Sequence, residues 1–192
     1  MTGRTHDMAA FTALSVVVVT QSLPHITLAT GIVAIVANLA GGIAPDIDQP
    51  TAPFWRNLPI GKYIGKTFDK FLGGHRFLSH SILGVFIFGF LFHYILQVFT
   101  PSFPRLNMQV IWWAFMIGFV SHLVMDTFTT EGVPWLLPIP VKFGIPPLKA
   151  FRIKTGGLIE RFGVFPALLF ISVYLIYAHY ETVKMVLHSY LK

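Results

Sequence analysis

Five apolar stretches separated by polar segments are the feature that most restricts how this chain can fold. They cover residues 8–20, 25–44, 81–99, 110–128 and 162–179. A membrane-spanning helix needs about 20 mostly apolar residues, and the last four stretches approach that length. The first stretch is shorter and follows charged residues, so we expect a helix that starts in the membrane interface. The sequence therefore predicts one all-α domain over residues 1–192, a polytopic membrane helical bundle with about five spans.

The composition is consistent with a protein that uses the bilayer as part of its solvent. Hydrophobic residues make up 54% of the chain and charged residues only 11%, compared with roughly 25% charged residues in a typical soluble domain. The chain has no cysteine, which excludes a disulfide-linked partner and thiolate metal ligands. Its formal net charge of +6 comes from basic residues scattered along the chain, so we expect no nucleic-acid partner.

The distribution of lysine and arginine predicts the orientation of the spans. If the polar segment 45–80 is cytoplasmic, eleven basic residues lie on the cytoplasmic side and three on the other side. The eleven are Arg4, Arg56, Lys62, Lys66, Lys70, Arg76, Lys142, Lys149, Arg152, Lys154 and Arg161. Cytoplasmic loops are enriched in lysine and arginine. We therefore predict that the N-terminus is cytoplasmic.

Eight residues with metal-ligand chemistry lie at the ends of the predicted spans. They are His6, Asp46, Asp48, His75, His80, His122, Asp126 and Glu160. In the predicted orientation all eight are at the cytoplasmic membrane face, although that orientation was derived from lysine and arginine alone. Imidazoles and carboxylates together suit zinc, manganese or iron. Eight ligands exceed the coordination sphere of one ion, and two or more ions would also reduce the repulsion among four carboxylates.

The spacing within two of these motifs favours a shared metal site. His122 and Asp126 are four residues apart, so they occupy the same face of a helix. Asp46 and Asp48 would point the same way if their segment were extended. Taken singly, each motif also has a structural explanation, such as a helix end in water or a buried hydrogen bond. Those explanations are weaker for the whole set, because they place every candidate at one membrane face by coincidence.

At these motifs the sequence resembles the YdjM-like family of inner-membrane-associated metal-dependent hydrolases. The family pattern contains an early His, Pro-Asp-Ile-Asp, His-Arg-Gly-x-Thr-His-Ser, Ser-His-x-x-x-Asp and a late Glu. The corresponding residues here are His6, 45–48, 75–81, 121–126 with Thr130 and Gly132, and Glu160. Phe77 and Ser79 replace the Gly and Thr of the third motif, and neither change removes a candidate ligand. The resemblance implies an integral protein of the bacterial cytoplasmic (inner) membrane.

The order of the ligands is also similar to that of the zinc-dependent phospholipase C and nuclease fold. That similarity implies two or three divalent transition-metal ions, zinc above all, and a phosphoester substrate. Together the two resemblances predict a hydrolase in which metal-bound water attacks a phosphoester. Because a site at the head-group level meets lipids first, we expect the substrate to be a membrane lipid or a lipid-linked molecule. Arg76, between the two loop histidines, is the candidate for binding the anionic group of the substrate. Candidates for orienting the metal ligands are Ser79, Ser81, Thr127 and Thr130.

Two other classes of function remain open at this point. Intramembrane His and Asp residues also suit a divalent-metal transporter or a metal-binding membrane sensor. A transport pathway, however, needs ionisable groups through the depth of the bilayer, and His93 is the only obvious deeper candidate. A membrane scaffold would need none of these ligands. An intramembrane zinc protease is disfavoured, because the sequence contains no His-Glu-x-x-His motif.

Overall fold

The structure is a computed structural model that describes residues 1–21, 26–50, 55, 59, 61–71, 76–139, 141–181 and 184. Its α-helices are α1 (Gly3–Thr20), α2 (Leu28–Ile43), α4 (Gly61–Phe71), α5 (Ile82–Phe99), α6 (Met108–Thr127) and α7 (Phe165–Ala178). Between them lie the short 3-10 helices η1 (Ala44–Asp48), η2 (Leu78–His80), η3 (Thr100–Ser102) and η4 (Lys149–Phe151), and the π-helical turn η5 (Glu160–Val164). The described residues form no β-strand, only two isolated β-bridges. The predicted all-α fold is confirmed.

Four helical segments are long and apolar enough to span a membrane. They are Leu28–Asp48, Ile82–Ser102, Met108–Thr127 and Glu160–Ala178, and they coincide with the last four predicted stretches. The polytopic membrane architecture is therefore confirmed, although residue 25, where the second stretch was predicted to begin, lies outside the described residues. Helix α1 contains the first stretch and is not among the four. Its first turns contain Arg4, His6 and Asp7, and a start in the membrane interface stays a prediction.

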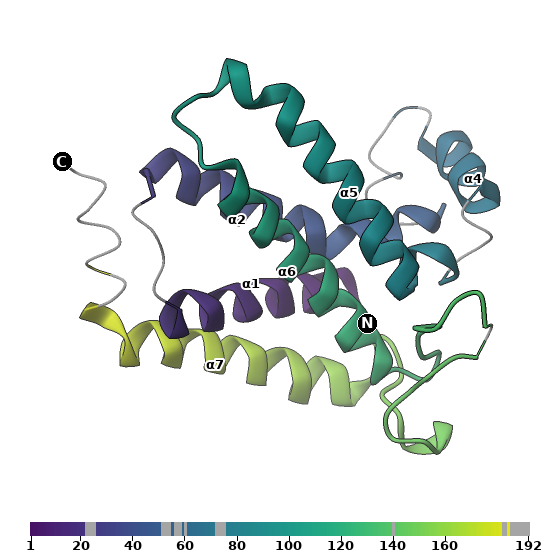
Figure 1. Cartoon of the computed structure of the whole chain (residues 1–192). Coiled ribbons are helices and arrows are strands. Elements are labelled where there is room, and N and C mark those ends of the chain that lie inside the picture. The colour runs from purple at the N-terminus through teal and green to yellow at the C-terminus, as the bar shows by residue number, and fades with distance from the viewer. Residues whose placement is uncertain are drawn as a thin grey trace.

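Helix α6 occupies the centre of the bundle (Figure 1). It packs against α1, α2 and α5, while α1 also packs against α2 and α7. Helices α5 and α7 expose many of their apolar side chains: Phe90 is 75% exposed on α5, and Phe170 is 71% exposed on α7. Such surfaces are typical of helices that face lipid rather than water.

Helices α2 and α6 approach each other closely because glycines line their contact. A Cβ atom on Gly41 would lie 2.0 Å from the carbonyl oxygen of Phe115, and one on Gly118 would lie 2.0 Å from that of Asn38. Small residues allow this kind of backbone contact between membrane helices. The buried Asn38 amide also donates to the carbonyl of Ala114 at 3.0 Å. The consequence for the site is that the end of α2 lies directly against the last turns of α6.

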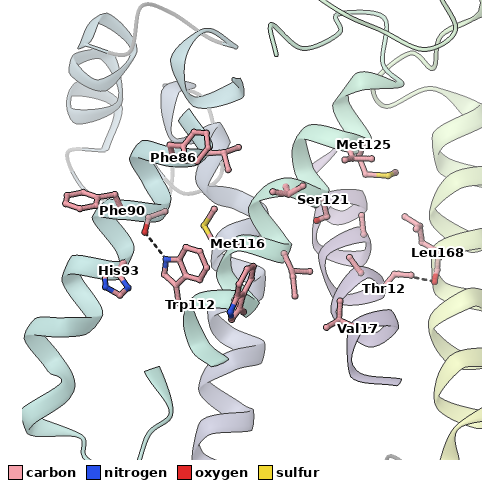
Figure 2. A pocket seen from close by; sticks show the side chains of 18 residues that line it. Thr12, Val17, Phe86, Phe90, His93, Trp112, Met116, Ser121, Met125 and Leu168 are labelled. Carbon is pink, nitrogen blue, oxygen red and sulfur yellow. Dashed lines mark hydrogen bonds between the residues drawn. The ribbon is translucent and has the colours of Figure 1, made fainter. Parts of the chain in front are cut away.

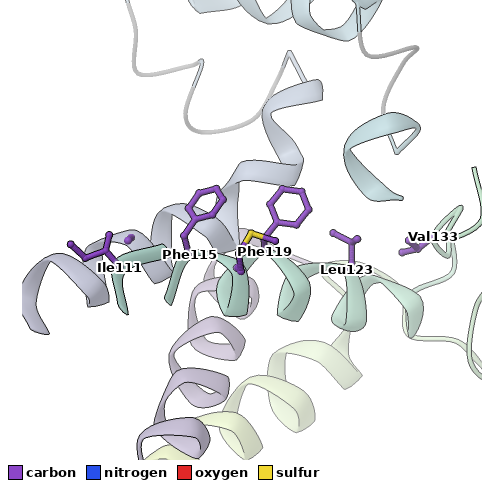
Figure 3. Packing of buried hydrophobic residues seen from close by; sticks show 7 residues of the cluster. Ile111, Phe115, Phe119, Leu123 and Val133 are labelled. Atoms are coloured by element: carbon purple, nitrogen blue, oxygen red, sulfur yellow. The ribbon is translucent and has the colours of Figure 1, made fainter. Parts of the chain in front are cut away.

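The hydrophobic core is a stripe along α6 (Figure 3). Ile111, Phe115, Phe119 and Leu123 repeat at four-residue intervals and are at most 7% exposed. That interval keeps the four side chains on one side of the helix. The stripe continues into Val133 beyond the helix. The last turns of α6, which contain His122 and Asp126, are therefore packed against the hydrophobic core.

Candidate metal centre

Five of the eight predicted ligands converge at one end of the bundle. They come from the start of α1, from η1, from η2 and from the last turns of α6: His6, Asp46, His80, His122 and Asp126. They form two overlapping groups, one of His6, His122 and Asp126 and one of Asp46, His80 and His122, and within each group the ligand atoms lie within 4.8 Å of one another. Four of the five side chains are at most 2% exposed, whereas that of Asp46 is 19% exposed. Solvent therefore reaches the cluster from the side of Asp46.

The distances within the cluster suit a metal ion. His80 Nε2 lies 3.8 Å from an oxygen of Asp46 and 3.7 Å from Oδ2 of Asp126, and the corresponding distances from His122 Nε2 are 3.6 and 3.8 Å. Ligand bonds of 2.0–2.1 Å in a tetrahedral zinc site place neighbouring ligand atoms about 3.3–3.4 Å apart. The four atoms would thus need to move inward by only a few tenths of an ångström.

The other carboxylate oxygen of Asp126 faces His6. His6 Nε2 lies 3.3 Å from Asp126 Oδ1, and the His6 ring stacks on the His122 ring with a centroid separation of 3.6 Å. The amino group of Met1 forms an ion pair with the same oxygen. Asp126 therefore presents one oxygen to His6 and the other to His80 and His122, as a carboxylate that bridges two ions would.

The hydrogen bond of His122 determines which of its ring nitrogens can bind a metal. Nδ1 lies 2.7 Å from the carbonyl oxygen of Gly42, which can only accept, so Nδ1 must hold the proton. In the neutral ring Nε2 then has a free lone pair. This nitrogen is buried and has no hydrogen-bond partner among the described residues. A buried imidazole held in this way has the tautomer and the orientation of a metal ligand.

His80 is oriented by a carboxylate and a hydroxyl group. Its Nδ1 lies 3.3 Å from Asp48 Oδ2 and 2.9 Å from the Ser79 hydroxyl, which itself donates to Asp48. Nε2 is thereby directed toward Asp46 and Asp126. The expected extended conformation of the Asp-Ile-Asp segment was wrong: the segment is the 3-10 helix η1. The two aspartates consequently contact opposite nitrogens of the His80 ring, Asp46 as a candidate ligand and Asp48 as the group that orients the ring.

Arg76 lies beside the cluster and is 6% exposed. Its guanidinium Nη2 lies 2.6 Å from Asp126 Oδ2, and its Nη1 donates to the Thr129 hydroxyl at 3.0 Å. The backbone has φ +58°, a left-handed conformation that is uncommon for a residue with a side chain. The Arg76 backbone N–H donates to Asp48 at 2.9 Å, which helps hold that conformation. Thr129 was not predicted from the sequence, where its only signal is its position three residues after Asp126.

Glu160 is buried but lies outside both groups of candidate ligands. Its Oε1 accepts hydrogen bonds from the backbone N–H and hydroxyl of Thr2 and from the hydroxyl of Thr5, each at 2.7 Å. Its Oε2 accepts from the backbone N–H of Gly156 at 2.7 Å. The structure thus places Glu160 at the N-terminus of α1, where four donors surround it. The remaining predicted ligand, His75, lies outside the described residues.

Three of the four residues expected to orient ligands have other contacts. Ser81 caps α5 by accepting from the N–H of Gly84, and the Thr127 hydroxyl donates to Leu123 and accepts from Trp135. The backbone N–H of Thr130 donates to the carbonyl of Ile153 at 3.0 Å. Of the four, only Ser79 contacts a candidate ligand, at Nδ1 of His80. Asp7, next to His6, belongs to neither group, and burial raises the pKa of its carboxyl group.

The fold and the site together define a class: a helical membrane protein that buries, at one end of its bundle, a His/Asp cluster able to hold a metal ion. Within that class, the chain belongs to the YdjM inner membrane protein family, whose sequence profile matches residues 1–185. The family resemblance noted from the motifs is confirmed. Relatives are named inner membrane proteins, which agrees with the predicted location in that membrane.

Individual relatives match different shares of the chain. The uncharacterized protein YvsG of Bacillus subtilis is 28% identical over 84% of this chain and 86% of its own length. The inner membrane protein YdjM of Escherichia coli is 33% identical over 62% of this chain. The match covers 55% of that protein, so the chain spans about half the length of this relative. No solved structure matches the chain.

Proposed function

We propose that this protein is a membrane-embedded metal-dependent hydrolase that cleaves a phosphoester of a lipid or lipid-linked molecule. The observation that supports this most is the convergence of two oriented imidazoles and two carboxylates on one buried point, with Nε2 of His122 left without a hydrogen-bond partner among the described residues. We further propose two ions. Asp46, His80, His122 and one oxygen of Asp126 would hold the first, and His6 with the other oxygen of Asp126 would contribute to the second.

Bound metal would supply a water of lowered pKa and a positive charge against the phosphoryl oxygens. The protein contributes the arrangement around it. Asp48 and the carbonyl of Gly42 favour the tautomers of His80 and His122 in which Nδ1 holds the proton and Nε2 has the lone pair. The partly exposed Asp46 marks the side from which water and substrate enter. The neighbouring membrane spans bring the site close to lipid.

Arg76 would bind the anionic group of the substrate. Two of its guanidinium nitrogens already contact Asp126 and Thr129. The third, Nε, is buried without a hydrogen-bond partner among the described residues. An arginine held in this way is pre-organised to donate to a phosphoryl oxygen as negative charge develops.

Metal analysis combined with an esterase assay tests this proposal. Purified protein should contain zinc, manganese or iron. It should release phosphate from phosphatidic acid or the head group from a phosphodiester lipid. A chelator should abolish that activity, and added metal should restore it. If instead metal crosses the bilayer of reconstituted vesicles in a His122-dependent way and no ester is cleaved, the protein is a transporter.

We propose that the metal centre faces the cytoplasm, because of the eleven-to-three bias in basic residues. Since the chain has no cysteine, single cysteines at the exposed residues Ser102 and Lys149 can report the side of each loop. A membrane-impermeant maleimide should label Ser102→Cys in intact cells and Lys149→Cys only after permeabilisation. Labelling of both from outside would refute the orientation.

A further inference from the structure

An apolar groove runs along α6 (Figure 2). Its volume is about 890 Å³, within the range of about 300–1,000 Å³ that is usual for ligand sites. Figure 2 shows α6 along the middle of the groove, α5 on one side, and α1 with Leu168 of α7 on the other side. Because α1 and α5 both pack against α6 from opposite sides, a strip of α6 between them stays uncovered.

The walls of the groove offer an occupant little except apolar surface. The Trp112 indole N–H donates to the carbonyl of Gly89 at 2.8 Å, and the Ser121 hydroxyl donates to Gly118 at 2.8 Å. The Thr12 hydroxyl bonds to Met8 and Ser172. These three polar groups are therefore already satisfied within the protein. The other polar lining residue, His93, has its Nε2 3.3 Å from the side-chain amide of Gln97. A hydrocarbon chain fits such walls, whereas a polar ligand would lose its hydrogen bonds to water without replacement.

The groove opens sideways from helices that span the membrane. Phe86 and Phe90 on α5 are 71% and 75% exposed, and Trp113 on α6 is 56% exposed. Both helices are apolar enough to lie within the bilayer. From Trp112 to Met125 the helix rises about 20 Å, slightly more than the roughly 15 Å of hydrocarbon in one leaflet. The groove is thus long enough for one acyl chain and is accessible from the lipid phase.

One end of the groove lies at the same level along α1 and α6 as the candidate ligands. On α6, Ser121 and Met125 line the groove and directly precede His122 and Asp126. On α1, the groove begins at Ala9, one helical turn beyond the candidate ligand His6. The helices that supply three of the five convergent candidate ligands therefore also form the groove.

We propose that the groove binds one acyl chain of the membrane lipid whose head group is cleaved at the metal centre. Cleavage of the head group rests on the proposed function, but binding of the chain does not. The site selects its substrate by the hydrocarbon anchor: a lipid with a long chain fills the groove, and a water-soluble ester with the same head group leaves it empty. Each methylene group buried in the groove strengthens binding.

Photo-crosslinking tests binding of the chain without any need for hydrolysis. The probe is phosphatidic acid with a diazirine in its acyl chain, incorporated with the metal-loaded full-length protein into nanodiscs. We expect the label on groove residues of α1 and α6. Ala13→Trp places a large ring in the groove and should lower that labelling by about tenfold, the equivalent of about two lost methylene contacts. Ala167→Trp, at an exposed position of α7 outside the groove, should leave the labelling unchanged.

Chain-length dependence provides the second measurement. For Ala13→Trp, kcat/KM should fall about tenfold for dioleoyl phosphatidic acid and stay within about twofold for the dihexanoyl lipid. Ile117→Trp, which fills the same groove from α6, should lower kcat/KM for the two lipids in the same pattern, provided that metal content is retained. Three results would overturn the proposal. They are uniform labelling of all lipid-facing helices, crosslinks between two copies of the chain through the groove, and an equal fall in kcat/KM on both substrates. If the groove is labelled but neither ester is cleaved, the hydrolase proposal fails and chain binding stands.

Discussion

Asp126 and Glu160 lie in two regions that the sequence alone made look equivalent. Both are carboxylates at the ends of predicted spans, and both are at most 1% exposed. Around Asp126 are three imidazoles, the guanidinium of Arg76 and the amino group of Met1. Around Glu160 are neutral hydroxyl and backbone N–H donors from Thr2, Thr5 and Gly156. The two acids are equally buried but differ completely in what surrounds them.

The difference separates a candidate ligand from a structural carboxylate. The Thr2 N–H at the start of α1 favours an anion such as Glu160, because the N-terminus of a helix has unpaired N–H groups and a partial positive charge. The oxygens of Glu160 are thus already occupied. Asp126 is also ion-paired, with the Met1 amino group and with Arg76. In addition it faces His122 Nε2, which has a lone pair rather than a proton to offer, as the bond from His122 Nδ1 to Gly42 requires. Only the Asp126 region has the chemistry of a metal site.

The largest effect is expected for His122→Ala. This change removes the one nitrogen shared by both groups of candidate ligands, so bound metal and hydrolysis should be lost together. The loss should exceed the 10–100-fold cost of removing an outer partner of a metal ligand. His179→Ala, which removes a histidine at the end of α7, is the matched control. If His122→Ala retained its full metal content, the cluster around Asp126 would not be the metal centre.

Arg76→Ala tests the chemistry at Asp126 separately from metal binding. It should lower kcat on the phosphoester substrate by about 100-fold, as loss of a stabilising donor does in other enzymes, while metal content stays near that of the unmodified protein. Arg105→Ala, at an exposed position in the turn between α5 and α6, controls for the loss of one positive charge. Equal loss of metal and activity would assign Arg76 a purely structural role.

A smaller effect is expected for Asp48→Asn. The amide keeps the shape of the side chain but weakens the hold on His80 Nδ1. Metal affinity should fall by about 10–100-fold, measured by competition with a chelating dye. Excess metal should restore activity, which distinguishes an orienting residue from a direct ligand. Failure of excess metal to restore activity would indicate that Asp48 itself binds the ion.

The smallest effect on activity is expected for Glu160→Gln, which therefore tests the comparison most directly. Metal content and kcat should stay within about twofold, because Glu160 belongs to neither group of candidate ligands. One amide oxygen cannot replace both carboxylate oxygens, so stability should fall by about 1–3 kcal/mol, seen as a lower thermal midpoint. Glu131→Gln, at an exposed position, should leave the midpoint unchanged. Loss of metal in Glu160→Gln would make the two regions equivalent after all.

The sequence alone determined the architecture and most members of the cluster. Apolar stretches near bilayer length leave few folds other than a helical membrane bundle, because backbone polar groups within lipid must be bonded internally. The spacing of His122 and Asp126 places them on one helix face whatever surrounds them. For this reason the sequence predicts α2, α5, α6 and α7, and the four candidate spans lie at these helices.

Only the tertiary structure decided which ionisable residues meet and what each one does. The role of Asp48 depends on η1 being a 3-10 helix, and the separation of Glu160 from Asp126 depends on Thr2, Thr5 and Gly156 lying around it. Neither fact has a local signal, because each arises from contacts between segments far apart in the chain. The tautomer of His122 is set in the same way, by a carbonyl that reaches it only because Gly41 and Gly118 let α2 and α6 touch.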